Sequence, residues 1–88
     1  MTIEAPTIKI YTKRLCSYCW RAKLLLTRRR IPYEEIRVGH DARLRSWLAE
    51  MSGQRTFPQV FVGERSIGGY SELTDLDRSG ELAELVGR

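Results

Sequence analysis

Cysteine and histidine are scarce in this 88-residue chain, which contains two cysteines and a single histidine, His40. A structural zinc site takes four such ligands, so the composition argues against one. Covalent haem attachment needs a histidine directly after a Cys-x-x-Cys pair, and Trp20 stands there instead. A structural disulfide between Cys16 and Cys19 would close too small a loop to stabilise the chain much. A redox role is therefore the best interpretation of the pair.

Long apolar runs are also absent, and none approaches the ~20 residues that cross a bilayer. The first residues, 1–6, lack the basic start and the apolar stretch of a signal peptide. We therefore expect a cytoplasmic protein with no membrane partner, in a compartment where a lone thiol pair is more often catalytic than structural. The length predicts one domain over residues 1–88.

Acidic residues are outnumbered, with 11 Asp and Glu against 15 Lys and Arg, which gives a net charge of +4. Three basic residues, Arg28 to Arg30, fall at the end of a predicted helix, where cations complement the helix dipole. The interleaving of aromatic and basic residues that is typical of RNA-binding proteins is missing. We expect no nucleic-acid partner, whereas an anionic small substrate or an acidic protein partner suits the charge.

The hydrophobic pattern predicts strands and helices that alternate along the chain. A helix separates the first two strands, which are therefore expected to be parallel. The last two strands flank Gly63-Glu64, which is typical of an antiparallel hairpin. The order βαβαββα favours an α/β fold with a mixed four-stranded sheet and helices on both faces. The expected strands are 7–11, 33–38, 58–62 and 65–67, and the expected helices are 20–30, 42–51, 71–76 and 81–86.

Individual residues mark the expected helix ends. Pro32 ends the first helix, because proline disfavours helix in the residue before it. Asp41 is expected to cap the start of the second helix and Ser71 that of the third. The second helix carries apolar residues three, four and seven positions apart, among which Trp47 is expected in the core.

The two cysteines stand at the junction between the first strand and the first helix. Only the thiolate is a nucleophile, and a free cysteine with a pKa of about 8.5 is little ionised at pH 7. Unpaired N–H groups and the positive dipole end at a helix N-terminus stabilise the anion. Cys16 precedes the helix and is predicted to be the exposed nucleophile, with Cys19 as the more buried resolving thiol. Lys13 adds positive charge near the sulfur.

Four motifs follow one another along the chain: Tyr11-Thr12-Lys13 running into Cys16-Ser17-Tyr18-Cys19, then Thr56-Phe57-Pro58, then Gly68-Gly69, then Ser71-Glu72-Leu73. In this order they resemble the glutaredoxin family, in its small dithiol class. The resemblance covers nearly the whole chain and implies one glutaredoxin domain over residues 1–88 with a thioredoxin-like fold. It also implies an enzyme that reduces protein disulfides and glutathione mixed disulfides, with glutathione as cosubstrate.

The resemblance implies a role for each matching residue. Cys16 attacks the mixed disulfide and becomes glutathionylated, and Cys19 resolves a protein-bound disulfide. Lys13 and a polar side chain of Gln54-Arg55 pair with the glycine carboxylate of glutathione, while Tyr18 packs beside the sulfur. The implied glutathione-binding residues are Lys13, Cys16, Tyr18, Gln54, Arg55, Thr56, Phe57, Pro58, Gly69, Tyr70 and Ser71.

The backbone carries the remaining implied contacts. Pro58 is expected to be cis, so that the N–H and C=O of Phe57 can pair with the cysteinyl residue of glutathione as an added strand does. Gly69, with Gly68 before it, allows close approach of the chain. The N–H groups of Tyr70 and Ser71 receive the γ-glutamyl carboxylate.

Three sites depart from the family's commonest pattern. Ser17 stands where proline is most frequent, Phe57 where valine is usual, and Tyr70-Ser71 where an acidic residue often holds the α-amino group of glutathione. Family members without that proline include some that bind a glutathione-ligated [2Fe–2S] cluster between two subunits. A cluster-binding dimer or carrier, with Cys16 as a ligand, is therefore an alternative to a monomeric reductase.

A thioredoxin-like reductant that is independent of glutathione is a third interpretation. Lys13, the Thr56-Phe57-Pro58 turn and Gly68-Gly69 favour a glutathione-binding groove over this alternative. Turnover with glutathione, rather than with thioredoxin reductase, distinguishes the two.

Overall fold

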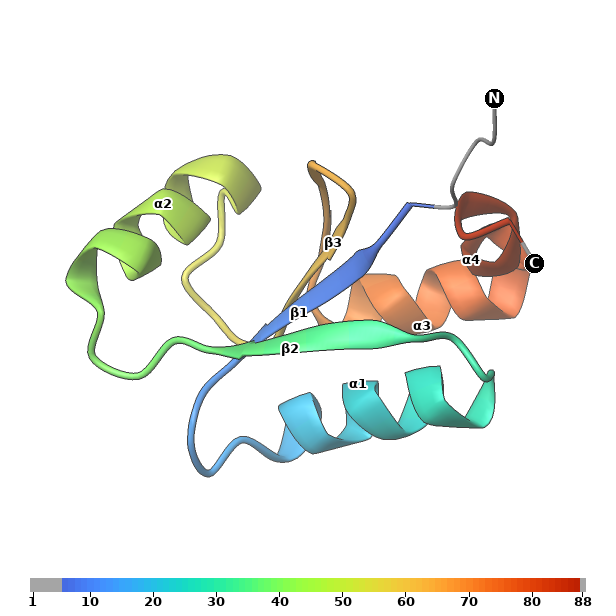
Figure 1. The fold of residues 1–88 in the computed structure, drawn as a ribbon, viewed down its shortest axis with the longest axis horizontal. Helices are drawn as coiled ribbons and strands as arrows, with labels where there is room; N and C mark the ends of the chain where they lie inside the picture. The colour runs from blue at the N-terminus through green and yellow to red at the C-terminus, as the bar shows by residue number, and fades with distance from the viewer. Residues whose placement is uncertain (1–5, 88) are drawn as a thin grey trace.

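A four-stranded sheet with helices on both faces forms the centre of the molecule (Figure 1). The computed structural model describes residues 6–87; residues 1–5, on which the expectation about a signal peptide largely rests, lie outside this range. The predicted order of elements is confirmed. The elements are β1 (Ile8–Thr12), α1 (Ser17–Arg28), β2 (Tyr33–Arg37), α2 (Ala42–Ser52), β3 (Gln59–Val62), β4 (Arg65–Gly68), α3 (Tyr70–Ser79) and α4 (Glu81–Leu85).

The strands lie in the order β2-β1-β3-β4. The central strand β1 pairs in parallel with β2, Ile8 lying opposite Tyr33, and antiparallel with β3, Ile10 lying opposite Val60. Strands β3 and β4 form the predicted antiparallel hairpin. The two central strands are almost fully buried because both of their faces are covered by helices. Across the described part of the chain, no helix is long and apolar enough to cross a membrane.

Alternation along β1 and β3 divides the core into two clusters. Ile8, Ile10 and Val60 face helices α1, α3 and α4 in the larger cluster, which also holds Leu26 and Leu73. The smaller cluster, under α2, contains Tyr11, Val38, Leu48 and Phe61. Helices α1 and α3 thus pack on the same face of the sheet.

The structure corrects several expected details. Helix α1 begins at Ser17 rather than Trp20, and it ends at Arg28, just before Arg30 adopts a φ of 57°. Asp41 caps α2 as predicted, its carboxylate accepting from the Leu44 N–H at 3.0 Å. The prediction for α3 is wrong, because Gly69 is its N-cap and Ser71 lies inside the helix. Trp47 is 41% exposed and lies flat over Phe61 rather than inside the core.

Candidate active site

The two cysteines lie where β1 leads into α1, and they form a disulfide with Cα atoms 5.2 Å apart. Cys16 is the N-cap of α1, and its sulfur accepts a hydrogen bond from the Cys19 N–H at 3.1 Å. This contact places the sulfur at the positive end of the helix, where a thiolate is stabilised. Cys16 is half-buried, whereas Cys19 is only 2% exposed. The geometry therefore leaves Cys16 as the sulfur that a substrate reaches first.

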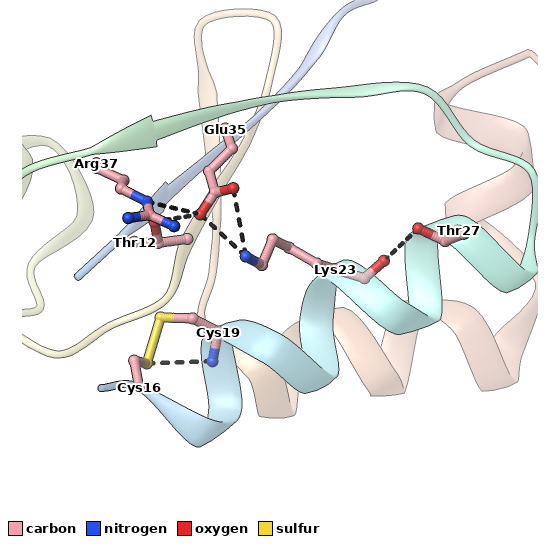
Figure 2. A network of polar contacts seen from close by, with 7 residues as sticks. All are labelled: Thr12, Cys16, Cys19, Lys23, Thr27, Glu35 and Arg37. Atoms are coloured by element: carbon pink, nitrogen blue, oxygen red, sulfur yellow. Dashed lines mark hydrogen bonds and ion pairs between the residues drawn. A yellow bond between two sulfur atoms is a disulfide. The ribbon is translucent and has the colours of Figure 1, made fainter. Parts of the chain in front are cut away.

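An ion pair between Lys23 and Glu35 lies near the two cysteines, as Figure 2 shows. Lys23 follows Cys19 by one helical turn and pairs with Glu35 of β2 at 3.1 Å. Thr12 donates a hydrogen bond to the same carboxylate at 2.7 Å and is the main cause of its lowered pKa, with Lys23 and Arg37 acting in the same direction against partial burial. Glu35 therefore neutralises Lys23, the basic residue one helical turn after Cys19.

The segment 54–58 forms one wall beside the cysteines. Its Phe57–Pro58 peptide bond is cis, as expected. Gln59, fully buried at the start of β3, fixes the segment from behind, because its amide donates to the carbonyls of Gln54 at 2.9 Å and Thr56 at 3.1 Å. The wall therefore presents backbone groups in a fixed arrangement.

The start of α3 forms the opposite wall. Gly69 packs so closely on Pro58 that a Cβ added there would lie 3.3 Å from the Pro58 carbonyl oxygen. Glu72, the third helical residue, accepts a hydrogen bond from the Gln54 amide at 2.9 Å. That bond is the main cause of the lowered pKa of Glu72; partial burial opposes it, and the N–H groups of Glu72 and Gly69 reinforce it. Unpaired N–H groups at a helix start are suited to an anionic group.

Between these walls lies a cavity of about 390 Å³, which we call the first groove. Tyr18 of α1 and Tyr70 of α3 close one side, their ring centroids 5.5 Å apart. Tyr18 is the second residue after Cys16, so the first groove opens next to the disulfide. The groove thus joins a fixed stretch of backbone to a helix N-terminus, and its lining residue Tyr18 connects it to the redox pair.

Comparison with known proteins identifies this arrangement. The glutaredoxin family model matches residues 8–67. The chain belongs to the glutaredoxin family. It is 41% identical over 81 residues to a glutaredoxin from Pseudomonas aeruginosa, covering 92% of this chain and 96% of that one. It is 38% identical over 79 residues to glutaredoxin 3 from Escherichia coli, covering 90% and 95% of the two chains.

Solved glutaredoxin structures have the same thioredoxin-like fold. The solution structure of glutaredoxin from Brucella melitensis superposes with a TM-score of 0.83 at 38% identity, over 94% of this chain and 90% of that one. The buckwheat glutaredoxin–glutathione complex gives a TM-score of 0.84 at 29% identity, over 93% and 77%. With the redox-active pair Cys16 and Cys19 in this family and fold, the glutaredoxin is a thiol–disulfide oxidoreductase.

Most of the residues predicted for glutathione meet at the first groove of this glutaredoxin. Eight of the eleven line it: Tyr18, Gln54, Thr56, Phe57, Pro58, Gly69, Tyr70 and Ser71. The other three, Cys16, Lys13 and Arg55, are not among its lining residues; Cys16 precedes the lining residue Tyr18 by two positions, and Lys13 and Arg55 are exposed. Glu72 also lines it but was not among the predicted residues. Its place as an acidic residue in the first turn of a helix is the signal that points to it.

The predicted iron–sulfur cluster needs more ligands than one chain of this glutaredoxin provides. Among residues 6–87, no group of three or more His, Cys, Asp and Glu side chains could hold a metal ion. Cys16 is bonded to Cys19 and offers a thiolate only after reduction. Further ligands would have to come from glutathione and a second chain, so the cluster-binding dimer stays a prediction.

Proposed function

We propose that this glutaredoxin uses glutathione as its electron donor and reduces both glutathione mixed disulfides and protein disulfides. The observation that carries the proposal is the first groove, which opens beside Cys16 and joins a fixed backbone wall to a helix N-terminus. A tripeptide with two carboxylates matches these groups, because exposed backbone pairs with an extended peptide and a helix N-terminus binds a carboxylate. A protein of this kind works where glutathione is kept reduced, which is the cytoplasm.

Cys16 reacts first with a glutathione mixed disulfide. Its thiolate attacks the glutathione sulfur, the old S–S bond breaks, and the client thiolate leaves and takes up a proton. A second glutathione thiolate then attacks the Cys16–glutathione bond, which releases glutathione disulfide and restores the Cys16 thiolate. The net reaction converts the mixed disulfide and one glutathione thiol into the free client thiol and one glutathione disulfide.

Cys19 acts when the substrate is a protein disulfide. Cys16 forms a mixed disulfide with the client, and the Cys19 thiolate then attacks Cys16, releasing the reduced client. The product is the Cys16–Cys19 disulfide of the present structure. Two glutathione molecules reduce it in turn. Burial of Cys19 suits this role, because Cys19 attacks only the neighbouring sulfur of Cys16 while that sulfur is bonded to the client.

Glu72 indicates which end of glutathione lies at the start of α3. In the absence of an acidic residue at positions 70 and 71, its carboxylate is the anionic group on the groove wall. We propose that it holds the α-amino group of the γ-glutamyl residue while the N–H groups of Tyr70 and Ser71 hold the α-carboxylate. Lys13 and Arg55, both exposed on long side chains, reach the glycine carboxylate at the other end.

Reduction of hydroxyethyl disulfide, coupled to glutathione and glutathione reductase, tests the proposal. Cys16→Ser should lower the rate to background, whereas Cys19→Ser should keep at least part of it, because the glutathione route needs only Cys16. Full activity in Cys16→Ser would contradict the assignment. Failure of the unaltered protein to turn over with glutathione, together with rapid reduction by thioredoxin reductase, would favour the thioredoxin-like alternative.

A further inference from the structure

A second groove, of about 540 Å³, runs between α1 and α3 on the helical face of the molecule. Its apolar lining includes Trp20 and Leu25 of α1 and Tyr70 of α3. Among the described residues, the charged side chains that line it are three arginines and one carboxylate, Asp77. None of the reactions above uses this groove, which we call the second groove.

The second groove shares a wall with the first. Tyr70 lines both, and its ring lies against that of Tyr18 at 5.5 Å. Arg21, which lines the second groove, lies over the other ring of this pair, its guanidinium carbon 5.5 Å from the Tyr18 centroid. Trp20, the residue after Cys19, also lines the second groove. The second groove therefore adjoins the first across the Tyr18–Tyr70 pair, on the helix that carries the redox pair.

Exposed apolar side chains are concentrated around the nucleophile. Of the five large hydrophobic residues that are exposed in the described part of the chain, three lie within four positions of Cys16. These are Leu15, which is 95% exposed, Tyr18, and Trp20, which is 61% exposed. Exposed apolar area of this kind next to a reactive sulfur is typical of a surface that another protein covers.

The charge of the second groove is positive. Arg29 donates two hydrogen bonds to Asp77, at 2.8 and 3.0 Å, so this pair neutralises itself at the far end of the groove. Arg21 and Arg28 are exposed, and no salt bridge to a described residue is found for either. Their charges are therefore available to an acidic ligand.

We propose that the second groove binds an acidic, partly apolar segment of the client protein, next to the disulfide that Cys16 attacks. The inference rests on the proposed function and names the kind of client. From Trp20 to Arg28 the helix rises by about 12 Å, which about four residues of extended chain can span. The client places its apolar side chain against Trp20 and Tyr70 and its carboxylates near Arg21 and Arg28, while glutathione uses the first groove.

Two glutathionylated peptides of equal length provide the test. One has Asp, Glu and Leu around its modified cysteine and the other has Lys, Arg and Leu. We expect kcat/KM for removal of glutathione to favour the acidic peptide at least tenfold at low salt, and the preference to shrink at high salt because the charges are exposed. Equal rates for the two peptides would overturn the inference.

Arg28→Glu and Arg43→Glu are a matched pair of variants. Both positions are exposed, but Arg43 lies on α2, on the other face of the sheet. Arg28→Glu should lower kcat/KM for the acidic peptide about tenfold, whereas Arg43→Glu should change it less than twofold. Equal losses in both variants would show a general effect of net charge and contradict the groove.

Tryptophan fluorescence of the protein reports peptide binding in the absence of thiol–disulfide exchange. An acidic peptide with serine in place of cysteine should change the emission, and Trp20→Phe should remove that response while the signal of Trp47 remains. Displacement of the peptide by single-stranded DNA of matched charge, at equal or lower concentration, would assign the groove to nucleic acid instead.

The hydroxyethyl disulfide assay separates the two proposals. If the unaltered protein does not reduce this small substrate with glutathione, the proposed function fails. If it does so, yet shows no preference for the acidic peptide, only the inference about the second groove fails.

Discussion

The two grooves on either side of the Tyr18–Tyr70 pair differ in the groups that line them. The first groove is lined by a segment with a cis peptide bond, a glycine and a helix N-terminus, together with the tyrosine pair. The second groove is formed by the side chains of two helices, several of them arginine. Backbone geometry suits a cosubstrate that never changes, whereas exposed side chains can vary with the client without disturbing the fold.

Among these variants, Gly68→Ala should lower the melting temperature most. It acts on the first groove through Glu72, which lines that groove. Gly68 has a φ of +105°, and an added Cβ would lie 2.7 Å from the Glu72 side chain. Strain at such a position costs about 1–3 kcal/mol, so we expect a fall in melting temperature of about 10 °C. Thermal unfolding measures it.

Gly39→Ala is the control for this prediction. Its φ is +56°, but nothing lies within 4 Å of the added Cβ. Gly39→Ala should therefore lower the melting temperature less than Gly68→Ala does. Equal losses in the two variants would mean that packing of Glu72 against Gly68 contributes nothing.

Glu72→Gln should weaken glutathione binding in the first groove and leave client binding in the second groove unchanged. If the carboxylate holds the α-amino group of glutathione, its loss removes a charge-assisted hydrogen bond of about 1.5–3 kcal/mol. The KM for glutathione should then rise about tenfold or more, while the ratio of rates for acidic and basic peptides stays the same. An unchanged KM for glutathione would show that Glu72 does not hold the α-amino group.

Glu35→Gln should affect stability but neither groove. The pKa of Glu35 is lowered in the folded protein, chiefly by Thr12, so its carboxylate stabilises the fold above about pH 4.5 and loses this effect as the pH falls below that value. For this partly exposed group we expect a loss of about 0.5–1 kcal/mol at pH 7 and a smaller loss near pH 3. Urea unfolding at both pH values tests this, and a larger loss at the lower pH would contradict it.

Asp77→Asn should have the smallest effect on stability and acts on the second groove alone. It releases Arg29 from its bidentate contact, which leaves one more unpaired cation in the groove. The preference for the acidic peptide should rise about twofold, the size expected for one exposed charge. A weaker preference would show that Arg29 must be held by Asp77 for the client to bind.

Features coded by neighbouring residues were predictable from the sequence. The order of elements, the Asp41 cap and the hairpin at Gly63-Glu64 follow from local patterns, and the structure has all three. The different exposure of Cys16 and Cys19 also follows, because one precedes a helix and the other lies in its first turn.

Features made by distant segments were not predictable. Ser71 is a typical capping residue, but α3 begins one residue earlier, after Gly69, which packs closely on Pro58. The bond between Gln54 and Glu72 and the shared wall of Tyr18 and Tyr70 join segments that are far apart in the chain. The second groove exists only once α1 and α3 pack on one face of the sheet.

Mass spectrometry of the Cys19→Ser variant tests the central claim most directly. After incubation with glutathione disulfide, we predict one glutathione adduct per chain, located on Cys16 by peptide mapping and removed by added glutathione. Failure of Cys16 to take up glutathione, in a variant that retains the native fold, would contradict the account.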